Sequence, residues 1–176
     1  MQKTTDPQDE LFYRVDEADK VLGSIKRGEA HHDASIIHRA AHLIIENNEG
    51  KILLQKRTMT KDKYPGAWID AVAGHVNYGS NYLDTIIREA LEEIGLDVKK
   101  ENIKEVGKLL FKAEAESEYV KCYKLVADIN IQELHLNADE VTKVQFFSLD
   151  EIRNLMQDPK VELVPITRSL LENFIV

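Results

Sequence analysis

The sequence predicts a mixed α/β fold in which helices cover a sheet. Three patterns support this class: a hairpin centred on Asn47–Gly50, a strong amphipathic helix from about Asn81 to Ile94, and a second helix over Ile166–Phe174. Elements with one apolar face bury that face by packing against each other in layers. The 176 residues, 43% of them apolar, are expected to form one compact domain.

The N-terminal part predicts an addition to the main fold. Residues 1–10 are polar and lack apolar periodicity, so we expect a loose lead-in without a chemical role. Leu11–Val15 and Val21–Ile25 have the composition of two short strands, which would pair as an added hairpin. We therefore separate an N-terminal lead-in and hairpin, residues 1–35, from a main domain, residues 36–176.

The main domain begins with the clearest hairpin. The apolar segments Ala40–Ile45 and Lys51–Gln55 flank Asn47–Gly50, where Asn and Gly accept the positive φ of a tight turn. Residues 61–76 are rich in turn formers and lead into the central helix, which Gly95 ends. Later strands are expected at Val106–Ala113, Tyr119–Ile129 and Val144–Ser148, followed by an amphipathic segment from Leu149.

The charge balance limits the class of partner. The chain has 31 Asp and Glu against 23 Lys and Arg, which gives a net charge of −8. Its basic residues form no stripe, which argues against duplex nucleic acid as a partner. An acidic protein with an anionic substrate would hold that substrate through a divalent metal or a few local basic side chains.

Cysteine content and hydropathy indicate the compartment. Cys122 is the only cysteine, so no intrachain disulfide can form, and its apolar neighbours predict a buried residue in a strand. The sequence shows neither a secretory signal nor an apolar run long enough to span a bilayer. We expect a cytoplasmic protein without a membrane partner.

The central helix combines a core-facing stripe with a carboxylate patch. The apolar stripe consists of Leu83, Ile86, Ile87, Ala90, Leu91 and Ile94. At about 100° per residue, Glu89, Glu92 and Glu93 share a neighbouring arc, with Arg88 at its edge. Like charges at this spacing repel, and Mg²⁺ or Mn²⁺ would relieve the repulsion. The alternative is an ordinary solvated face on which Arg88 and Glu92 form an ion pair.

The segment Gly74–Leu96 resembles the Nudix box, which is a glycine, five residues, a glutamate, seven residues and then Arg-Glu-aliphatic-x-Glu-Glu-x-Gly-aliphatic. Gly74 provides the first glycine, and Arg88-Glu89-Ala90-Leu91-Glu92-Glu93-Ile94-Gly95-Leu96 provides the second half at the correct spacing. The resemblance implies a Nudix-like α/β/α sandwich with a mixed sheet. It also implies a hydrolase that cleaves a diphosphate linkage in a nucleoside diphosphate derivative or similar small molecule.

The same resemblance implies the roles of the site residues. Glu89, Glu92 and Glu93 would hold Mg²⁺ or Mn²⁺, together with the carbonyl of Gly74. A metal-activated water would attack phosphorus in line, and Glu89 or a later glutamate would accept its proton. Glu140 is that later candidate, because Nudix proteins often carry an acidic residue before the following strand; its alternative is a loop carboxylate in solvent. We therefore expect Glu89, Glu93 and Glu140 to be catalytic.

One position departs from the box, since Ser80 stands where the family has its first glutamate. Its hydroxyl would serve as the N-cap of the helix. The lost carboxylate leaves the number of metals and the orientation of Arg88 open. It also favours a catalytically silent nucleotide-binding module, against which the intact glutamate trio argues.

Outside the box, the chain is similar to the isopentenyl-diphosphate isomerase branch of the superfamily. The matching residues are His38, Gln55-Lys56-Arg57, Lys61, Pro65-Gly66-Ala67-Trp68, Gly74-His75 and Glu116-x-Glu118. The resemblance implies a second metal site formed by His38, His75, Glu116 and Glu118, with a further histidine at His31 or His32. The isomerase needs a cysteine where this chain has Ala73, and it commonly lacks the paired glutamates. Both differences favour a hydrolase over the isomerase alternative.

Substrate contacts and assembly are further expectations. Arg57 and Lys61 are expected to contact the diphosphate of a small-molecule substrate. Trp68 would either stack on a nucleobase or isoprenoid or anchor the packing after Pro-Gly. His42, alone on a strand, is more typical of a structural histidine. By analogy, the N-terminal hairpin would form a homodimer contact.

Overall fold

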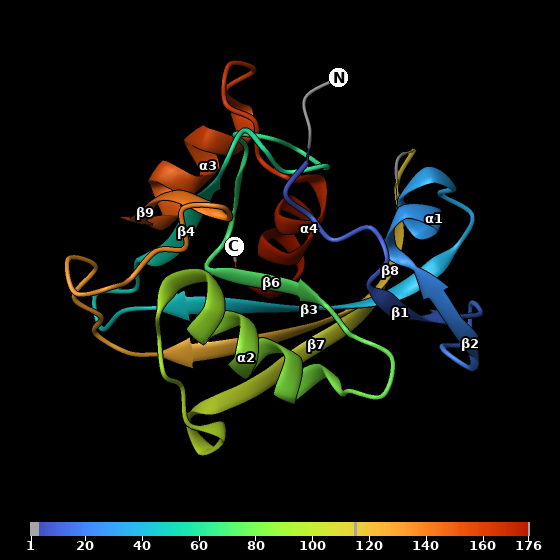
Figure 1. Cartoon of the computed structure of the whole chain (residues 1–176). Helices are drawn as coiled ribbons and strands as arrows, with labels where there is room; N and C mark the ends of the chain where they lie inside the picture. Colours follow the sequence, from blue (N-terminus) through green and yellow to red (C-terminus); the bar gives the residue numbers. More distant parts are fainter. Residues whose placement is uncertain (1–3, 115, 176) are drawn as a thin grey trace.

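The computed structural model describes residues 4–114 and 116–175, and it contains a mixed sheet with helices on both faces (Figure 1). In chain order the elements are β1 (Leu11–Val15), β2 (Val21–Lys26), α1 (Arg27–His32), β3 (Ile37–Glu46), β4 (Ile52–Arg57), β5 (Trp68–Asp70), β6 (Val72–His75), α2 (Tyr82–Ile94), the 3₁₀ turn η1 (Lys100–Asn102), β7 (Ile103–Lys112), β8 (Ser117–Val126), β9 (Val141–Phe147), α3 (Leu149–Gln157) and α4 (Pro165–Phe174). The expected mixed α/β class is confirmed.

The central strand is β3, which forms ladders with four other strands. It runs parallel to β8 and antiparallel to β1, β4 and β6. Strand β9 continues the sheet beyond β4, and β7 continues it beyond β8. Because β3 has neighbours along its whole length, it is buried almost throughout, and His38 and His42 on this strand lie in the interior.

Alternate residues of β3 serve two cores, as the period of two along a strand requires. Leu43 and Ile45 pack with the apolar face of α2 on one side of the sheet. Ala40 and Ile44 pack with α3 and α4 on the other. Figure 1 shows α2 on one face and α3 and α4 on the opposite face, so the expected three-layer sandwich is confirmed.

Several elements differ from the sequence prediction. The hairpin β1–β2 forms as expected, and β1 joins the main sheet through Arg14–His38 and Val15–Ile37 pairs. The turn-rich residues 61–76 contain two short strands, β5 and β6, which neighbouring strands hold in place. The short helix α1 was not predicted, and β8 ends at Val126 rather than Ile129. Strands and helices this short carry too few residues for a periodic signal.

Helix α2 begins one residue later than the sequence suggests. Asn81, not Ser80, is the N-cap, because the Asn81 side chain accepts a hydrogen bond from the Asp84 N–H at 2.9 Å. Gly95 ends the helix with φ at 68°, and its N–H donates to the last-turn carbonyls. Leu91 is 58% exposed, so its assignment to the core-facing stripe is wrong.

A network of buried polar side chains connects the sheet to α4 across the core that they enclose. The Asp70 carboxylate, fully buried, lies 3.0 Å from His42 Nδ1 and accepts a hydrogen bond from the Thr167 hydroxyl at 2.6 Å. These contacts connect β3, β5 and α4. His42 therefore has the structural contacts expected of it. Cys122 is buried as expected, and no helix in the described residues is long and apolar enough to cross a membrane.

Asp70→Asn is expected to lower the free energy of unfolding by about 2–4 kcal/mol, because the amide removes the negative charge that pairs with the buried His42 and turns one of the two acceptor oxygens into a donor. Urea denaturation measures the change. Asp150→Asn, at a side chain that is 88% exposed, is the matched control and should change stability by less than about 0.5 kcal/mol. Equal free energies of unfolding for the two variants would contradict a structural role for the contacts of Asp70 with His42 and Thr167.

Candidate active site

Helix α2 directs Glu93 beneath strand β6. The Glu93 side chain is 6% exposed, and its carboxylate accepts hydrogen bonds from Gln55 Nε2 at 3.0 Å and from the Ala73 N–H at 3.3 Å. Burial, with the nearby charges of Glu89 and Glu140, raises the pKa of Glu93 well above its usual value. A carboxyl with this surplus of negative charge around it is a strong ligand for a cation.

Glu89 lies one turn earlier and shares the environment. Burial raises the pKa of Glu89 to about 7, and Glu92 adds to the effect while Arg88 opposes it. Arg88 donates to Glu89 at 2.7 Å and to Glu92 at 2.5 Å. The expected Arg88–Glu92 pair therefore forms. Glu93 is buried, however, and the Glu89 side chain is only 16% exposed, so the patch is more than a solvated face.

Position 74 requires a glycine because the Glu89 side chain lies against its backbone. A Cβ built at Gly74 would overlap the side chain of Glu89. The backbone of β6 and the Glu89 carboxyl are thus in direct contact, as the expected pairing of a Gly74 carbonyl with the glutamates requires.

Gly74→Ala is expected to displace Glu89 and to weaken Mn²⁺ binding about ten- to hundredfold, because a methyl group cannot occupy the space of the carboxyl. Titration calorimetry measures the affinity. Gly50→Ala, far from the cluster, is the control for a destabilising glycine substitution: no atom lies within 4 Å of its built Cβ, but its φ of +75° is strained for alanine, so stability should fall while Mn²⁺ affinity is kept. Unchanged Mn²⁺ affinity in Gly74→Ala would contradict a site at Glu89.

The carboxylates face a cavity of about 200 Å³, which we call the outer cavity. Its lining includes Lys61, Gly74, Glu89, Glu92, Glu93 and Glu140. Glu140, expected as a late catalytic residue, thus reaches the cluster, and its carboxylate pairs with Lys61. The donor set is all oxygen and crowded with negative charge, which fits a hard divalent cation such as Mg²⁺ or Mn²⁺.

A second cluster lies beside the first, on α1, β3 and β6. His31, His38 and His75 each offer one ring nitrogen, and these atoms lie within 4.8 Å of one another. Glu118 Oε1 on β8 lies 3.0 Å from His75 Nε2 and 3.2 Å from His38 Nε2. Phe12 of β1 stacks on His75 and His38, which is how the N-terminal hairpin covers the cluster.

The outer contacts of this cluster orient its ligand atoms. Asp62 holds His31 Nδ1 at 2.9 Å, which leaves Nε2 directed at His75 at 3.3 Å. His38 Nε2, although 3.2 Å from Glu118 Oε1, makes no hydrogen bond in the described part of the chain, and neither does the buried Glu116 Oε1. Buried polar atoms that make no hydrogen bond, beside converging imidazoles, fit a bound cation. His31, rather than the exposed His32, is the third histidine.

An inner cavity of about 60 Å³ adjoins the outer one. Its lining includes His42, Tyr64, Ala73, Glu116, Glu118 and Ile166. Burial, with Glu118 adding to the effect, raises the pKa of Glu116 to about 7. Although burial opposes it, contact with His38 and His75 holds the pKa of Glu118 well below its usual value. Ala73 exposes only a methyl group to this cavity.

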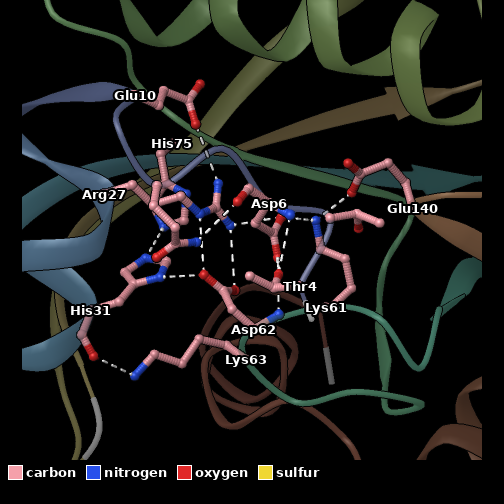
Figure 2. Close-up of polar contacts among 12 residues, drawn as sticks. Thr4, Asp6, Glu10, Arg27, His31, Lys61, Asp62, Lys63, His75 and Glu140 are labelled. Carbon is pink, nitrogen blue, oxygen red and sulfur yellow. Dashed lines mark hydrogen bonds and ion pairs between the residues drawn. The ribbon is translucent and has the colours of Figure 1, made fainter. Parts of the chain in front are cut away.

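The three residues expected to contact the substrate differ in whether they line a cavity and in what they pair with. Arg57 lines both cavities, and its Nε donates to the Lys63 carbonyl at 3.1 Å. Lys61 reaches the outer cavity but pairs with Asp6 as well as Glu140 (Figure 2). Trp68 lines neither cavity, and its ring meets Phe147 edge-to-face with the ring centroids 5.1 Å apart. Of the two roles expected for Trp68, these contacts are those of a packing anchor.

The lead-in has a role that sequence reasoning missed. Thr4–Glu10 lie against the site rather than loosely, and the Asp6 side chain is 1% exposed. Arg27 is likewise buried, paired with Asp6, Glu10 and Asp62. Acidic and basic residues this far apart in sequence give no local pattern, so only the folded chain brings them together.

Comparison with known proteins defines the family. The family model described as the NUDIX domain matches residues 36–169. The chain belongs to the Nudix family. It is 32% identical over 154 residues to an uncharacterized Nudix hydrolase of Pseudomonas aeruginosa, covering 85% of this chain and 88% of that protein. It is also 27% identical over 188 residues to isopentenyl-diphosphate Delta-isomerase II of Camptotheca acuminata, covering 92% of this chain and 60% of that protein.

Solved structures show the same Nudix fold. A protein of Deinococcus radiodurans matches with a TM-score of 0.77 at 18% identity, covering 93% of this chain and 98% of that one. A MutT NUDIX hydrolase of Burkholderia pseudomallei matches with a TM-score of 0.63 at 22% identity, covering 80% and 98%. The resemblance to the Nudix family and its isomerase-like relatives is therefore confirmed.

Proposed function

We propose that this Nudix protein is a divalent-metal-dependent hydrolase that cleaves a diphosphate linkage in a small anionic molecule, such as a nucleoside diphosphate derivative. One observation carries the proposal: Glu89, Glu93 and Glu140 converge on the outer cavity. There burial, with the charges of Glu89 and Glu140, raises the pKa of Glu93. Such a cluster is costly without a cation and useful with one.

The chain's own residues divide the work. Glu89, Glu92 and Glu93, with the Gly74 carbonyl, would hold Mg²⁺ or Mn²⁺, which would lower the pKa of a bound water and neutralise phosphate charge. Arg57, on the boundary between the cavities, is placed to contact a phosphate oxygen. Glu89 or Glu140, both of which line the outer cavity, would accept the proton of the attacking water.

We further propose that His31, His38, His75 and Glu118 form a second cation site, with Glu116 as an additional ligand. His38 Nε2 and Glu116 Oε1, both buried without a hydrogen bond, support this assignment. Both cavities share Gly74 and His75, so this site would border the same substrate. A cation here would position the substrate rather than replace the glutamate site.

The isomerase alternative is supported by the same histidines and by the relatives' similarity. Against it stands Ala73, whose methyl group faces the inner cavity where an acid is needed. A hydrolase needs no acid at that position. The intact glutamates and their burial therefore favour hydrolysis.

The compartment is a separate part of the proposal. The single buried cysteine accords with the cytoplasm.

Phosphorus NMR with Mg²⁺ or Mn²⁺ tests the function. The panel is a nucleoside diphosphate, a dinucleotide, a nucleotide sugar and isopentenyl diphosphate, and metal-dependent cleavage of one of them is the expected result. Proton NMR follows isopentenyl diphosphate in parallel. Its conversion to the dimethylallyl isomer, with every diphosphate intact, would replace hydrolase with isomerase; binding without any conversion would support a silent module.

A further inference from the structure

The carboxylate of Asp6 occupies the position of an anion at the edge of the outer cavity. It bridges Lys61 Nζ and Arg27, the latter at 3.0 Å, and accepts a hydrogen bond from the Asp62 N–H at 2.9 Å. Figure 2 shows these contacts converging on Asp6 from α1, which carries Arg27, and from the loop that carries Lys61 and Asp62. Two cations and a backbone N–H around one oxygen pair are the groups that bind a phosphate oxygen.

Asp6 can leave without exposing an uncompensated charge. Lys61 keeps Glu140 as a partner, and Arg27 keeps Glu10 and Asp62, so each cation has another carboxylate. Removing one carboxylate from a buried pair is costly only when its partner is left unpaired. Negative charge already exceeds positive charge here, which makes Asp6 the easily replaced member.

The segment that carries Asp6 makes its shortest backbone hydrogen bonds at its far end. Residues 4–10, which we call the N-terminal strap, join the fold there through Gly28 N–H to Gln8 and Arg27 N–H to Glu10, at 3.0 and 2.8 Å. Toward its start the hydrogen bonds of Thr5 are longer: its N–H lies 3.4 Å from the Thr60 carbonyl, and its hydroxyl lies 3.3 Å from the Thr60 hydroxyl and 3.4 Å from the Asp139 carbonyl. Asp6 and Pro7 themselves line the outer cavity, so a movement of this end opens it.

We propose that Asp6 determines specificity by occupying a phosphate subsite, formed by Arg27, Lys61 and the Asp62 N–H, until a diphosphate displaces it. The inference rests on the proposed function, because it concerns how that substrate enters. An internal carboxylate competes with every anion, so a singly bound phosphate gains little. A diphosphate that also reaches the metal-binding glutamates gains enough to displace Asp6.

Asp6→Asn tests the proposal, because the amide keeps the size and the acceptor oxygen of the side chain while removing its charge. Calorimetry with Mg²⁺ present measures the binding of inorganic phosphate and inorganic diphosphate to the full chain. Asp6→Asn is expected to bind phosphate about tenfold more tightly and to discriminate less between the two anions. Asp9→Asn, on the same strap but in an exposed pair with Lys26, should leave both affinities unchanged.

The opposite result has a clear meaning. If Asp6 is only a structural anchor, Asp6→Asn will lose thermal stability, and its affinity for phosphate and for diphosphate will be the same as that of wild type or lower. That result would overturn the proposal. If the variant fails to fold, hydrogen exchange of the wild-type chain decides. Faster exchange of the Thr5 N–H, which bonds to Thr60 at the end of the strap that carries Asp6, on adding diphosphate supports displacement, and unchanged or slower exchange overturns it. Binding requires no turnover, so failure to hydrolyse any substrate would refute the proposed function without changing this result.

Discussion

Glu93→Gln is expected to lower kcat for the preferred diphosphate by about a thousandfold or more while leaving the fold intact. The amide keeps the shape of the side chain but removes the charge that a metal requires. Glu93 is the most buried of the helix glutamates, so its loss cannot be compensated by solvent. Steady-state kinetics at saturating Mg²⁺ measures the change.

Stability separates this loss from misfolding. Because burial and two carboxylate neighbours raise the pKa of Glu93, removing its charge is expected to maintain or increase the metal-free melting temperature. Glu101→Gln, at an exposed glutamate, is the matched control and should keep full activity. Comparable turnover in Glu93→Gln and Glu101→Gln would remove Glu93 from the mechanism.

Without metal, Glu89 is expected to make the protein less stable as the pH rises from 4.5 to about 7. Burial raises the pKa of Glu89 from 4.5 to about 7, so the folded state binds more protons than the unfolded state between these values. Stability is full below this window and is lost as the pH rises through it, by roughly 3 kcal/mol for one such carboxyl. A divalent cation should restore it by favouring the ionised form.

The histidines require a difference measurement. Burial lowers the pKa values of His31 and His75, which makes stability rise with pH below 6.5 and opposes the effect of Glu89. The stability of Glu89→Gln minus that of wild type isolates the glutamate. In chelator this difference should grow from pH 5 to pH 8, and Mn²⁺ should reverse its sign. A difference that stays constant with pH would show that burial does not raise the pKa of Glu89 in the folded protein.

The Nudix segment could be predicted because its signals are local. The glutamates lie on one helix, α2, so helical spacing brings them together before any tertiary contact is known. Gly74, on the preceding strand β6, was assigned to them by the resemblance to the Nudix box. The error at Leu91 has a tertiary cause. It belongs to the stripe by angle, but the helix face that packs in the core includes Ile86, Ala90 and Ile94 and not Leu91, whose side chain is 58% exposed.

The second cluster and the strap required the folded chain. His31 and His32 are adjacent in sequence, and only the short helix α1 decides that His31 faces His75 while His32 points to solvent. Asp6 meets Lys61 across fifty-five positions of sequence, without periodicity in either segment. Polar residues at such separations show no pattern, because their pairing depends on where the strands place them.

The most direct test is hydrolysis in water enriched with oxygen-18, followed by phosphorus NMR of the products. With Mg²⁺ and the preferred substrate of the panel, one product phosphate should carry one heavy oxygen per turnover, and Glu93→Gln should form none. An intact diphosphate, or products without the label, would contradict water attack on phosphorus at the site of Glu89, Glu92 and Glu93.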